Sequence, residues 1–191
     1  MPELPPAAAW RLVDAHAGFE VLFPRVGRDG SMMEGQSTGV EEGEAWAVRY
    51  AVALDTGWAT RSAHVTGLSA AGVHEVRIEG DGRGEWRVDG RPAPELSGCL
   101  DVDLEGSACT NAFPVRRLAL EVGQRAEAPA VYVRAPDLRV ERLEQHYERL
   151  EDDGELTRYD YASPGFGVEC VLAYDRSGLV LDYPGIAVRV A

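Results

Sequence analysis

Two aspartates stand two residues apart in an otherwise apolar stretch, residues 100–104 (LDVDL). In an extended strand, residues i and i+2 point to the same face, so the carboxylates of Asp101 and Asp103 are expected about 7 Å apart. That separation is near the lower limit for an inverting glycosidase, and an Asp-x-Asp pair also suits a divalent cation. The simpler interpretation is a polar strand face, solvated or paired with Arg116 and Arg117.

Other patterns that could support chemistry are weaker. Residues 35–39 (GQSTG) match the Gly-x-Ser-x-Gly nucleophile elbow, which needs a strand before Ser37 and a helix after it. The flanking segments 29–34 and 40–43 favour a flexible Gly-rich loop instead. Cys170 shares an alternating face with apolar neighbours and is expected in the core. No metal site is predicted, because metal-ligand spacing is missing from the four histidines, His16, His64, His74 and His146.

Aromatic residues are the remaining candidates for a binding site. Their rings offer apolar area and faces for sugar rings, although such residues more often fill a core. The spacing alone supports either role for Trp58, Trp86, Phe113, Tyr132, Tyr159, Tyr161 and Tyr183.

The chain is strongly acidic, with 32 Asp and Glu against 19 basic residues, all of them arginine. The absence of lysine excludes Schiff-base and lysine-base chemistry and the phosphate-binding lysine of a P-loop. A net charge of -13 argues against nucleic acid as a partner, since binding to a phosphate backbone needs a basic surface. Anionic membrane surfaces are disfavoured for the same reason.

The bulk properties are those of an ordinary globular protein, with 45% hydrophobic and 27% charged residues over 191 positions. We expect one domain over residues 1–191 and no cofactor. The N-terminal residues do not resemble a secretory signal, and no run approaches the ~18 apolar residues of a transmembrane segment. Three cysteines without a Cys-x-x-Cys pair suit a reducing compartment, so we predict a cytoplasmic protein.

The candidate residues lie in a pattern of short strands. Apolar residues alternate over 44–54, which predicts a long half-buried strand, and segments 58–65, 73–78 and 85–88 extend it into an antiparallel meander. Gly and Pro separate the segments and favour an all-β roll, barrel or sandwich. Further strands are predicted at residues 98–104, 118–122, 130–134, 156–161, 166–174 and 179–183.

Residues 136–150 are ambiguous. Their helix-forming composition and the spacing of Leu143, Tyr147 and Leu150 favour a helix, and as a strand Val140 and Leu143 do not alternate cleanly. Local propensity therefore predicts a helix, while the surrounding pattern leaves a strand open.

Three stretches in a fixed order carry a family resemblance: residues 84–90 (GEWRVDG), 96–104 (LSGCLDVDL) and 110–118 (TNAFPVRRL). With them, the chain resembles the glycolipid-binding protein family of bacteria over almost its whole length. Further matching positions are Trp10, Gly18, Glu20, Asp55, Trp58, Gln145, Tyr147, Tyr159, Tyr161 and residues 178–185 (GLVLDYPG).

The resemblance implies an all-β, mainly antiparallel spiral β-roll: a single strongly curved sheet with at most one or two short helices. Its shape is expected to be similar to that of periplasmic lipoprotein carriers. It also implies an extended conformation for residues 140–149, against local propensity. A concave apolar face of this kind can shelter acyl chains at about 0.8 kcal/mol per buried CH₂, while polar groups at the rim hold a head group.

The expected function is therefore non-enzymatic binding of a lipid or glycolipid. The polar candidates for contacting it are Asp101, Asp103, Asn111 and Arg116, and the apolar candidates are Trp58, Trp86 and Tyr183. Arg117 is a candidate either for an anionic head group or as a structural partner of the aspartates. The net charge favours a neutral sugar head group.

Two other functions remain open. The first is a small hydrolase or sugar-processing enzyme centred on Asp101 and Asp103. The second is a purely structural or protein-interaction role, which an exposed apolar patch or sheet edge would indicate.

Overall fold

The computed structural model describes residues 3–13, 17–41 and 43–191 and shows two β-sheets. The larger sheet has 14 strands in the order β10-β13-β14-β15-β16-β17-β1-β2-β3-β4-β5-β6-β7-β8. In chain order, the first eight strands of this sheet are β1 (Ala8–Leu12), β2 (Gly18–Val26), β3 (Ser31–Glu41), β4 (Glu44–Leu54), β5 (Thr60–Ser69), β6 (Gly72–Gly80), β7 (Trp86–Val88) and β8 (Arg91–Pro92). The others are β10 (Arg125–Glu127), β13 (His146–Arg149), β14 (Thr157–Ser163), β15 (Val168–Tyr174), β16 (Val180–Tyr183) and β17 (Ala187–Arg189).

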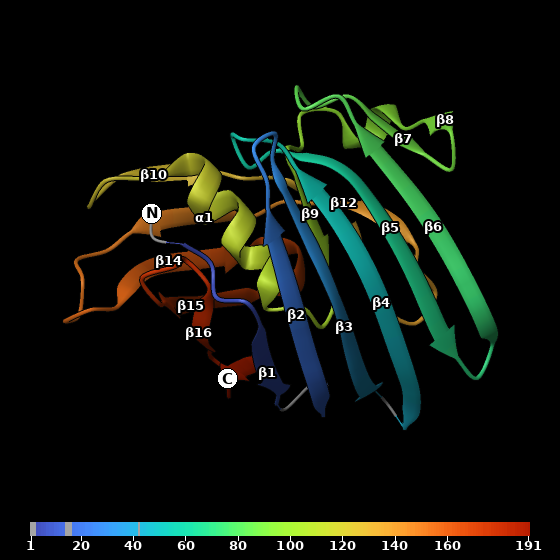
Figure 1. The fold of residues 1–191 in the computed structure, drawn as a ribbon, viewed down its shortest axis with the longest axis horizontal. Coiled ribbons are helices and arrows are strands. Elements are labelled where there is room, and N and C mark those ends of the chain that lie inside the picture. The colour runs from blue at the N-terminus through green and yellow to red at the C-terminus, as the bar shows by residue number, and fades with distance from the viewer. Residues whose placement is uncertain (1–2, 14–16, 42) are drawn as a thin grey trace.

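The smaller sheet has the order β12-β11-β9 and lies inside the curve of the larger one (Figure 1). Its strands are β9 (Asp101–Leu104), β11 (Ala130–Val133) and β12 (Val140–Leu143), of which β9 and β11 are parallel. A short helix α1 (Ala112–Leu118) follows β9, and three 3-10 turns complete the structure: η1 (Pro94–Leu96), η2 (Cys109–Asn111) and η3 (Pro164–Phe166). The all-β, mainly antiparallel curved sheet is confirmed, whereas the second sheet was not anticipated.

The predicted meander is confirmed as β4 to β7, with every neighbouring pair antiparallel. In β4, Trp46, Val48, Tyr50 and Val52 are buried, while the residues between them are half-buried or exposed. This alternation directs one apolar face of the strand into the curve of the sheet.

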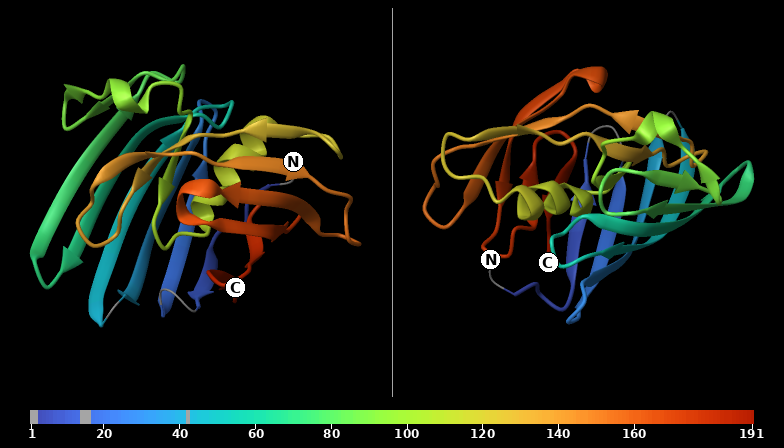
Figure 2. Two further views of the ribbon diagram at one scale, coloured as in Figure 1. Left: turned by 180° about the vertical axis from the view of Figure 1, so that it is seen from behind. Right: turned by 90° about the horizontal axis from the view of Figure 1, so that it is seen from above.

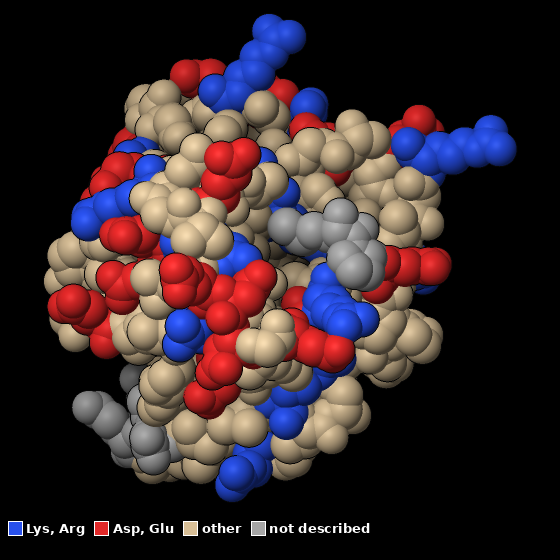
Figure 3. Space-filling model, turned by 90° about the vertical axis from the view of Figure 1, so that its left-hand side faces the viewer, with Lys and Arg blue, Asp and Glu red and all other residues tan. Residues whose placement is uncertain are grey.

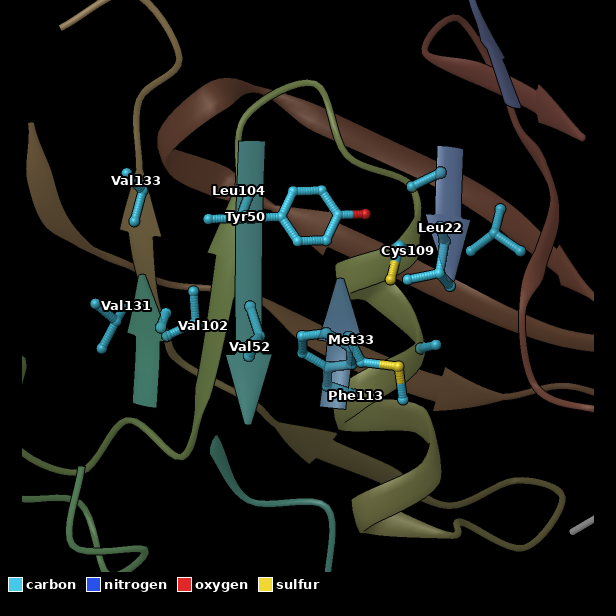
Figure 4. Close-up of a cluster of buried hydrophobic side chains, with 14 of the residues drawn as sticks. Leu22, Met33, Tyr50, Val52, Val102, Leu104, Cys109, Phe113, Val131 and Val133 are labelled. Carbon is cyan, nitrogen blue, oxygen red and sulfur yellow. The ribbon is translucent and has the colours of Figure 1, made fainter. Parts of the chain in front are cut away.

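The core fills the concave side of the sheet. Helix α1 lies between the half of the sheet formed by the early strands and the half formed by the late strands (Figure 2). Phe113 of α1 packs near Leu22 of β2 and Met33 of β3, and Val102 and Val131 extend the cluster through the small sheet (Figure 4). The centre of the roll is thus packed with side chains, and space for a ligand has to be sought elsewhere.

Three local expectations need revision or refinement. The loop predicted for residues 29–43 is wrong in its main part, because residues 31–41 form β3. The glycines there serve strand packing: a Cβ at Gly35 would lie 2.3 Å from the Tyr50 hydroxyl, and one at Gly39 would lie 2.5 Å from the Trp46 ring. Since a strand continues on both sides of Ser37, this segment is no nucleophile elbow.

The strand predicted at residues 118–122 is also wrong. Leu118 is the last residue of α1, and Ala119 ends the helix in the left-handed region at φ 46°. Residues 119–124 form no strand, and Val122 is exposed. The apolar alternation there reflects a helix end followed by a turn.

The extended conformation of residues 140–149 is confirmed, but it comprises two strands. Val140–Leu143 is β12 of the small sheet, and His146–Arg149 is β13 of the large one, with Glu144 and Gln145 between them. Leu143 and Tyr147 belong to different sheets, so the two-residue alternation of a single strand does not continue from one to the other. Their four-residue separation therefore resembles the spacing of a helix by coincidence.

Candidate functional site

A pocket of about 410 Å³ opens between the end of β9 and the late strands of the large sheet. It combines polar groups with aromatic and aliphatic side chains, as ligand sites commonly do, and its size lies within the ~300–1,000 Å³ typical of them. Its lining consists of Asp103, Leu104, Glu105, Gly106, Ser107, Asn111, Tyr132, Arg134, Leu143, Tyr161, Ser163, Phe166, Val168, Tyr183 and Ile186.

Asp103 is one of two buried carboxyls that line this pocket, with 8% of its surface exposed. Its Oδ1 accepts a hydrogen bond of 2.6 Å from the Thr110 hydroxyl. Burial, with smaller contributions from the nearby carboxyls of Asp101 and Glu20, raises the pKa of Asp103 to about 7, against the opposing effect of hydrogen bonds from Thr110 and the Leu104 backbone N–H. Near neutral pH this carboxyl is therefore about half protonated.

Asp101 has a different environment, although it lies only two residues away on β9. Arg117 of α1 donates to both of its oxygens, at 3.0 Å from Nε and 2.5 Å from Nη2. Asp101 is 1% exposed and does not line the pocket. Burial raises its pKa, and the Arg117 guanidinium opposes that shift. This pair matches the structural role considered for Arg117.

Asn111 and two tyrosines form further parts of the pocket wall. The Asn111 side-chain Oδ1 accepts from the Tyr147 hydroxyl at 3.0 Å, and its backbone carbonyl accepts from Tyr174 at 3.3 Å. No described residue accepts from its amide N–H groups, so both remain available to a ligand. Tyr161 and Tyr183 stand edge to face with ring centroids 5.7 Å apart, and burial raises the pKa of both, so both hydroxyls stay protonated.

The loop from Gly106 to Cys109, which forms one wall, is fixed from behind by the fully buried Glu20 of β2. Its carboxylate accepts from the Ser107 hydroxyl, from the backbone N–H groups of Ala108 (2.7 Å) and Cys109 (3.3 Å), and from the Tyr50 hydroxyl (2.7 Å). Burial raises the pKa of Glu20 and these hydrogen bonds lower it. Glu20 thus positions the pocket wall without lining it.

Another side of the pocket is formed by the buried Glu105 and Tyr132 together with the more exposed Arg134 and Phe166. Glu105 accepts from the backbone N–H of Ala135 at 2.8 Å and lies 3.8 Å from the Arg134 guanidinium. The Tyr132 and Phe166 rings are 5.1 Å apart, and Phe166 is 46% exposed. An apolar rim of this kind suits a ligand that has an apolar portion.

The structure divides the predicted site residues into two groups. Asp103, Asn111 and Tyr183 line the pocket together. Arg116 stacks on the half-buried Trp58 ring at 4.2 Å and donates to the Ser177 carbonyl, and neither Arg116 nor Trp58 lines the pocket. The other residues that do not line it are Asp101, Arg117 and Trp86.

Trp86 has a structural environment. It is 4% exposed, and its indole N–H donates to the Cys99 carbonyl at 2.9 Å. A Cβ at Gly80 would lie 2.9 Å from this ring, so the ring packs directly on the neighbouring strand. It therefore connects β7 to the chain entering β9.

Sequence reasoning missed Glu105, Ser107, Arg134 and Phe166 as site residues. Glu105 could have been predicted from the sequence, because it continues the i, i+2 series of acidic residues that begins with Asp101 and Asp103. Glu20 could have been predicted as well, since it alternates with the buried Leu22 on the inward face of β2. Arg134 and Phe166 could not, because only the fold brings them next to β9.

Cys170 is half-buried and packs against the core, near the position expected for it. The described histidines His64, His74 and His146 do not join any cluster of three or more potential metal ligands in the described ranges. His16 lies outside the described residues.

A curved antiparallel sheet with a small mixed polar and aromatic pocket beside its packed centre defines a class of β-roll with a ligand-sized site. Comparison with known proteins then gives the family. Residues 7–189 match the family described as "Putative glycolipid-binding", and the chain belongs to that family.

One solved structure is similar over most of its length. It is the crystal structure of a DUF1089 family protein from Pseudomonas aeruginosa, with 38% sequence identity and a TM-score of 0.79. The match covers 91% of this chain and 92% of that one. A search of curated proteins found no match.

Proposed function

We propose that the protein binds one glycolipid through its sugar head group, in the pocket beside β9, without catalysing a reaction. The observation that supports this most strongly is the composition of the pocket. Asp103 and Asn111 provide hydrogen-bonding groups for hydroxyls, and the tyrosine rings provide apolar faces. The family description points to the same class of ligand.

The apolar part of the ligand would leave the pocket over its rim. Val168 is half-buried, Phe166 is exposed, and both line the pocket. A volume of about 410 Å³ suits a head group and a short length of chain rather than a whole lipid. The rest of the chain would then lie against the surface or in the source membrane.

Charge favours a head group that is not anionic. The protein carries -13 overall, and acidic side chains gather on the face at the left-hand side of Figure 1 (Figure 3). The pocket lining includes one arginine, Arg134, and two carboxyls, Asp103 and Glu105. A phosphate or carboxylate there would meet more negative than positive charge.

The geometry gives less support to hydrolysis by Asp101 and Asp103. A glycosidase needs both carboxyls against one substrate, and Asp101 is buried against Arg117 outside the pocket. We also place the protein in the cytoplasm, which agrees with its three free cysteines. No helix in the described ranges is both long and apolar enough to span a membrane.

The test fills the pocket and measures binding of octyl β-glucoside by calorimetry. Val168→Trp places a large ring at the rim and is expected to weaken binding by at least tenfold. Val171→Trp is the matched control, because Val171 lies on the same strand, β15, but is 41% exposed and outside the pocket.

Native mass spectrometry of gently purified protein adds a second readout. We expect a co-purified lipid on the wild type and on Val171→Trp, and its loss from Val168→Trp. Equal binding by both variants would remove the pocket as the ligand site, and failure of the wild type to bind any alkyl glycoside would remove the proposed function.

A further inference from the structure

The four buried acids of the described chain differ in how their charge is compensated. Asp101 has the bidentate Arg117, and Glu20 has four hydrogen-bond donors. Glu105 has a backbone N–H and the neighbouring Arg134. Asp103 has the Thr110 hydroxyl and the backbone N–H of Leu104, both uncharged, and no described arginine or histidine forms an ion pair with it.

The charged groups that act on Asp103 make an added cation favourable. Asp101 on its own strand and Glu20 from β2 are both acidic, and both disfavour its ionised form. Across the pocket, Arg134 already faces Glu105 at 3.8 Å and Glu141 at 3.4 Å. A positive charge brought next to a buried carboxyl of this kind stabilises its anionic form.

The aromatic walls favour the same ligand chemistry. Tyr161 and Tyr183 pair at 5.7 Å, Tyr132 and Phe166 pair at 5.1 Å, and all four line the pocket that contains Asp103. The faces of such rings attract cations, most strongly where water is excluded. The pocket therefore combines an uncompensated carboxyl with aromatic faces, a combination typical of sites that recognise ammonium groups.

We propose that the head group bound in this pocket carries a protonated amine, as in an amino sugar, and that the amine pairs with Asp103. This inference rests on the proposed function, because it specifies the chemical class of the same ligand. The amine supplies the positive charge that the protein lacks at this point, while Asn111 offers its amide N–H groups to a neighbouring hydroxyl.

Binding of this kind has a proton signature. Free Asp103 titrates near neutral pH, and pairing with an ammonium group holds it ionised, so its bound proton is released. At pH 7 we expect a net release of a fraction of a proton per amine bound: the protonated fraction of free Asp103 less the neutral fraction of the free amine. A neutral sugar leaves the ionisation of Asp103 nearly unchanged.

The experiment compares octyl glycosides that differ in one substituent. At C2 they carry a hydroxyl (glucoside), an amine (glucosaminide) or an acetamido group (N-acetylglucosaminide). A further glucoside carries an amine in place of the hydroxyl at C6. Calorimetry at pH 7 in two buffers of different ionisation enthalpy gives affinity and proton release together. We expect an amine to bind about 10- to 100-fold more tightly than its neutral counterparts, as a charge-assisted hydrogen bond provides.

Asp103→Asn is expected to abolish both the amine preference and the proton release, because asparagine carries no charge to pair with the amine and no titrating proton to release. Glu141→Gln is the matched control. It makes the same change in net charge beside Arg134, but it does not line the pocket, so the preference is expected to persist.

The outcomes separate this inference from the proposed function. If amine and neutral glycosides bind the wild type equally, or if the preference survives Asp103→Asn, the inference is wrong and the glycolipid site still stands. If no octyl glycoside binds, the proposed function itself fails. Proton release by the wild type is an independent readout that needs no variant.

Discussion

Strand β9 contains two aspartates, Asp101 at its first position and Asp103 at its third, and their electrostatic environments are opposite. At the first position, Asp101 is held by two hydrogen bonds from Arg117 and is closed to ligands. At the third, Asp103 meets uncharged donors, the Thr110 hydroxyl and the Leu104 backbone N–H, and lines a pocket. Both side chains leave the same face, so the difference comes from what packs there: α1 brings an arginine to one end, and the loop after β9 brings Thr110 to the other.

This comparison shows that burial of a carboxylate does not by itself indicate its role. A paired buried charge mainly fixes the packing around it, and removal of one partner leaves the other uncompensated. A buried carboxylate without an ion-pair partner is unfavourable for folding, and such a group is a candidate for binding a ligand. The two aspartates therefore predict opposite responses to the same Asp→Asn substitution.

The largest expected effect is at the paired end. Asp101→Asn leaves the Arg117 guanidinium, only 14% exposed, without its anion, and is expected to lower the free energy of unfolding by about 3–5 kcal/mol. Chemical denaturation at pH 7 measures this. The double variant Asp101→Leu with Arg117→Met is expected to recover part of the loss, because neither charge then remains buried. A negligible cost for Asp101→Asn would contradict the assignment of a structural ion pair.

Asp103→Asn is expected to have an effect of opposite sign, one that depends on pH. Because the folded pKa of Asp103 is raised to about 7, its contribution to stability is fully present below about pH 4 and is lost as pH rises to about 7. Asparagine resembles the protonated acid and still accepts from Thr110. Since a rise of about three pKa units corresponds to about 4 kcal/mol, the variant should be more stable than the wild type by up to about 4 kcal/mol at pH 8 and nearly equal to it at pH 4.

Denaturation curves of both proteins at pH 4, 6 and 8 check the sign. A variant that is less stable than the wild type at pH 8 would show that ionised Asp103 is compensated in the fold, and the contrast between the two ends of β9 would disappear.

The smallest expected effect is on binding at the Asp101 end. The Trp58 ring stacks on Arg116 outside the pocket, so Trp58→Ala should change the affinity for octyl β-glucoside by less than about twofold. Calorimetry measures this affinity, and the loss measured for Val168→Trp in the same experiment is the reference for a disrupted site. A tenfold loss would place the ligand at this end of β9 instead.

Sequence patterns predicted those parts of the fold that depend on neighbouring residues. The alternation in β4 to β7 is visible because each strand pairs with the next and buries one face. Residues 31–41 were misassigned because Gly35 and Gly39 were taken for loop residues. Their small size accommodates Tyr50 and Trp46 from β4, and that contact depends on register.

The site was less predictable than the fold. The LDVDL motif located the carboxyls, but which of them is paired depends on α1, and the seven residues of this helix had no clear helical signal. Tyr132 and Tyr183 could be named only as general aromatic candidates. Arg134 and Phe166 reach the pocket through β11 and the turn after β14, so only the three-dimensional structure identifies them.

The pairing of β1 with β17 affects how the chain can be made. Trp10 donates to the Val180 carbonyl at 2.7 Å, and residues 10–12 pair with residues 187–189. The middle of the large sheet therefore forms only after nearly the whole sequence shown has left the ribosome. Until then, β1 and β16 are open sheet edges, which favour aggregation. Such long-range closure slows folding, so the incomplete chain is the form in which these edges are most exposed to aggregation.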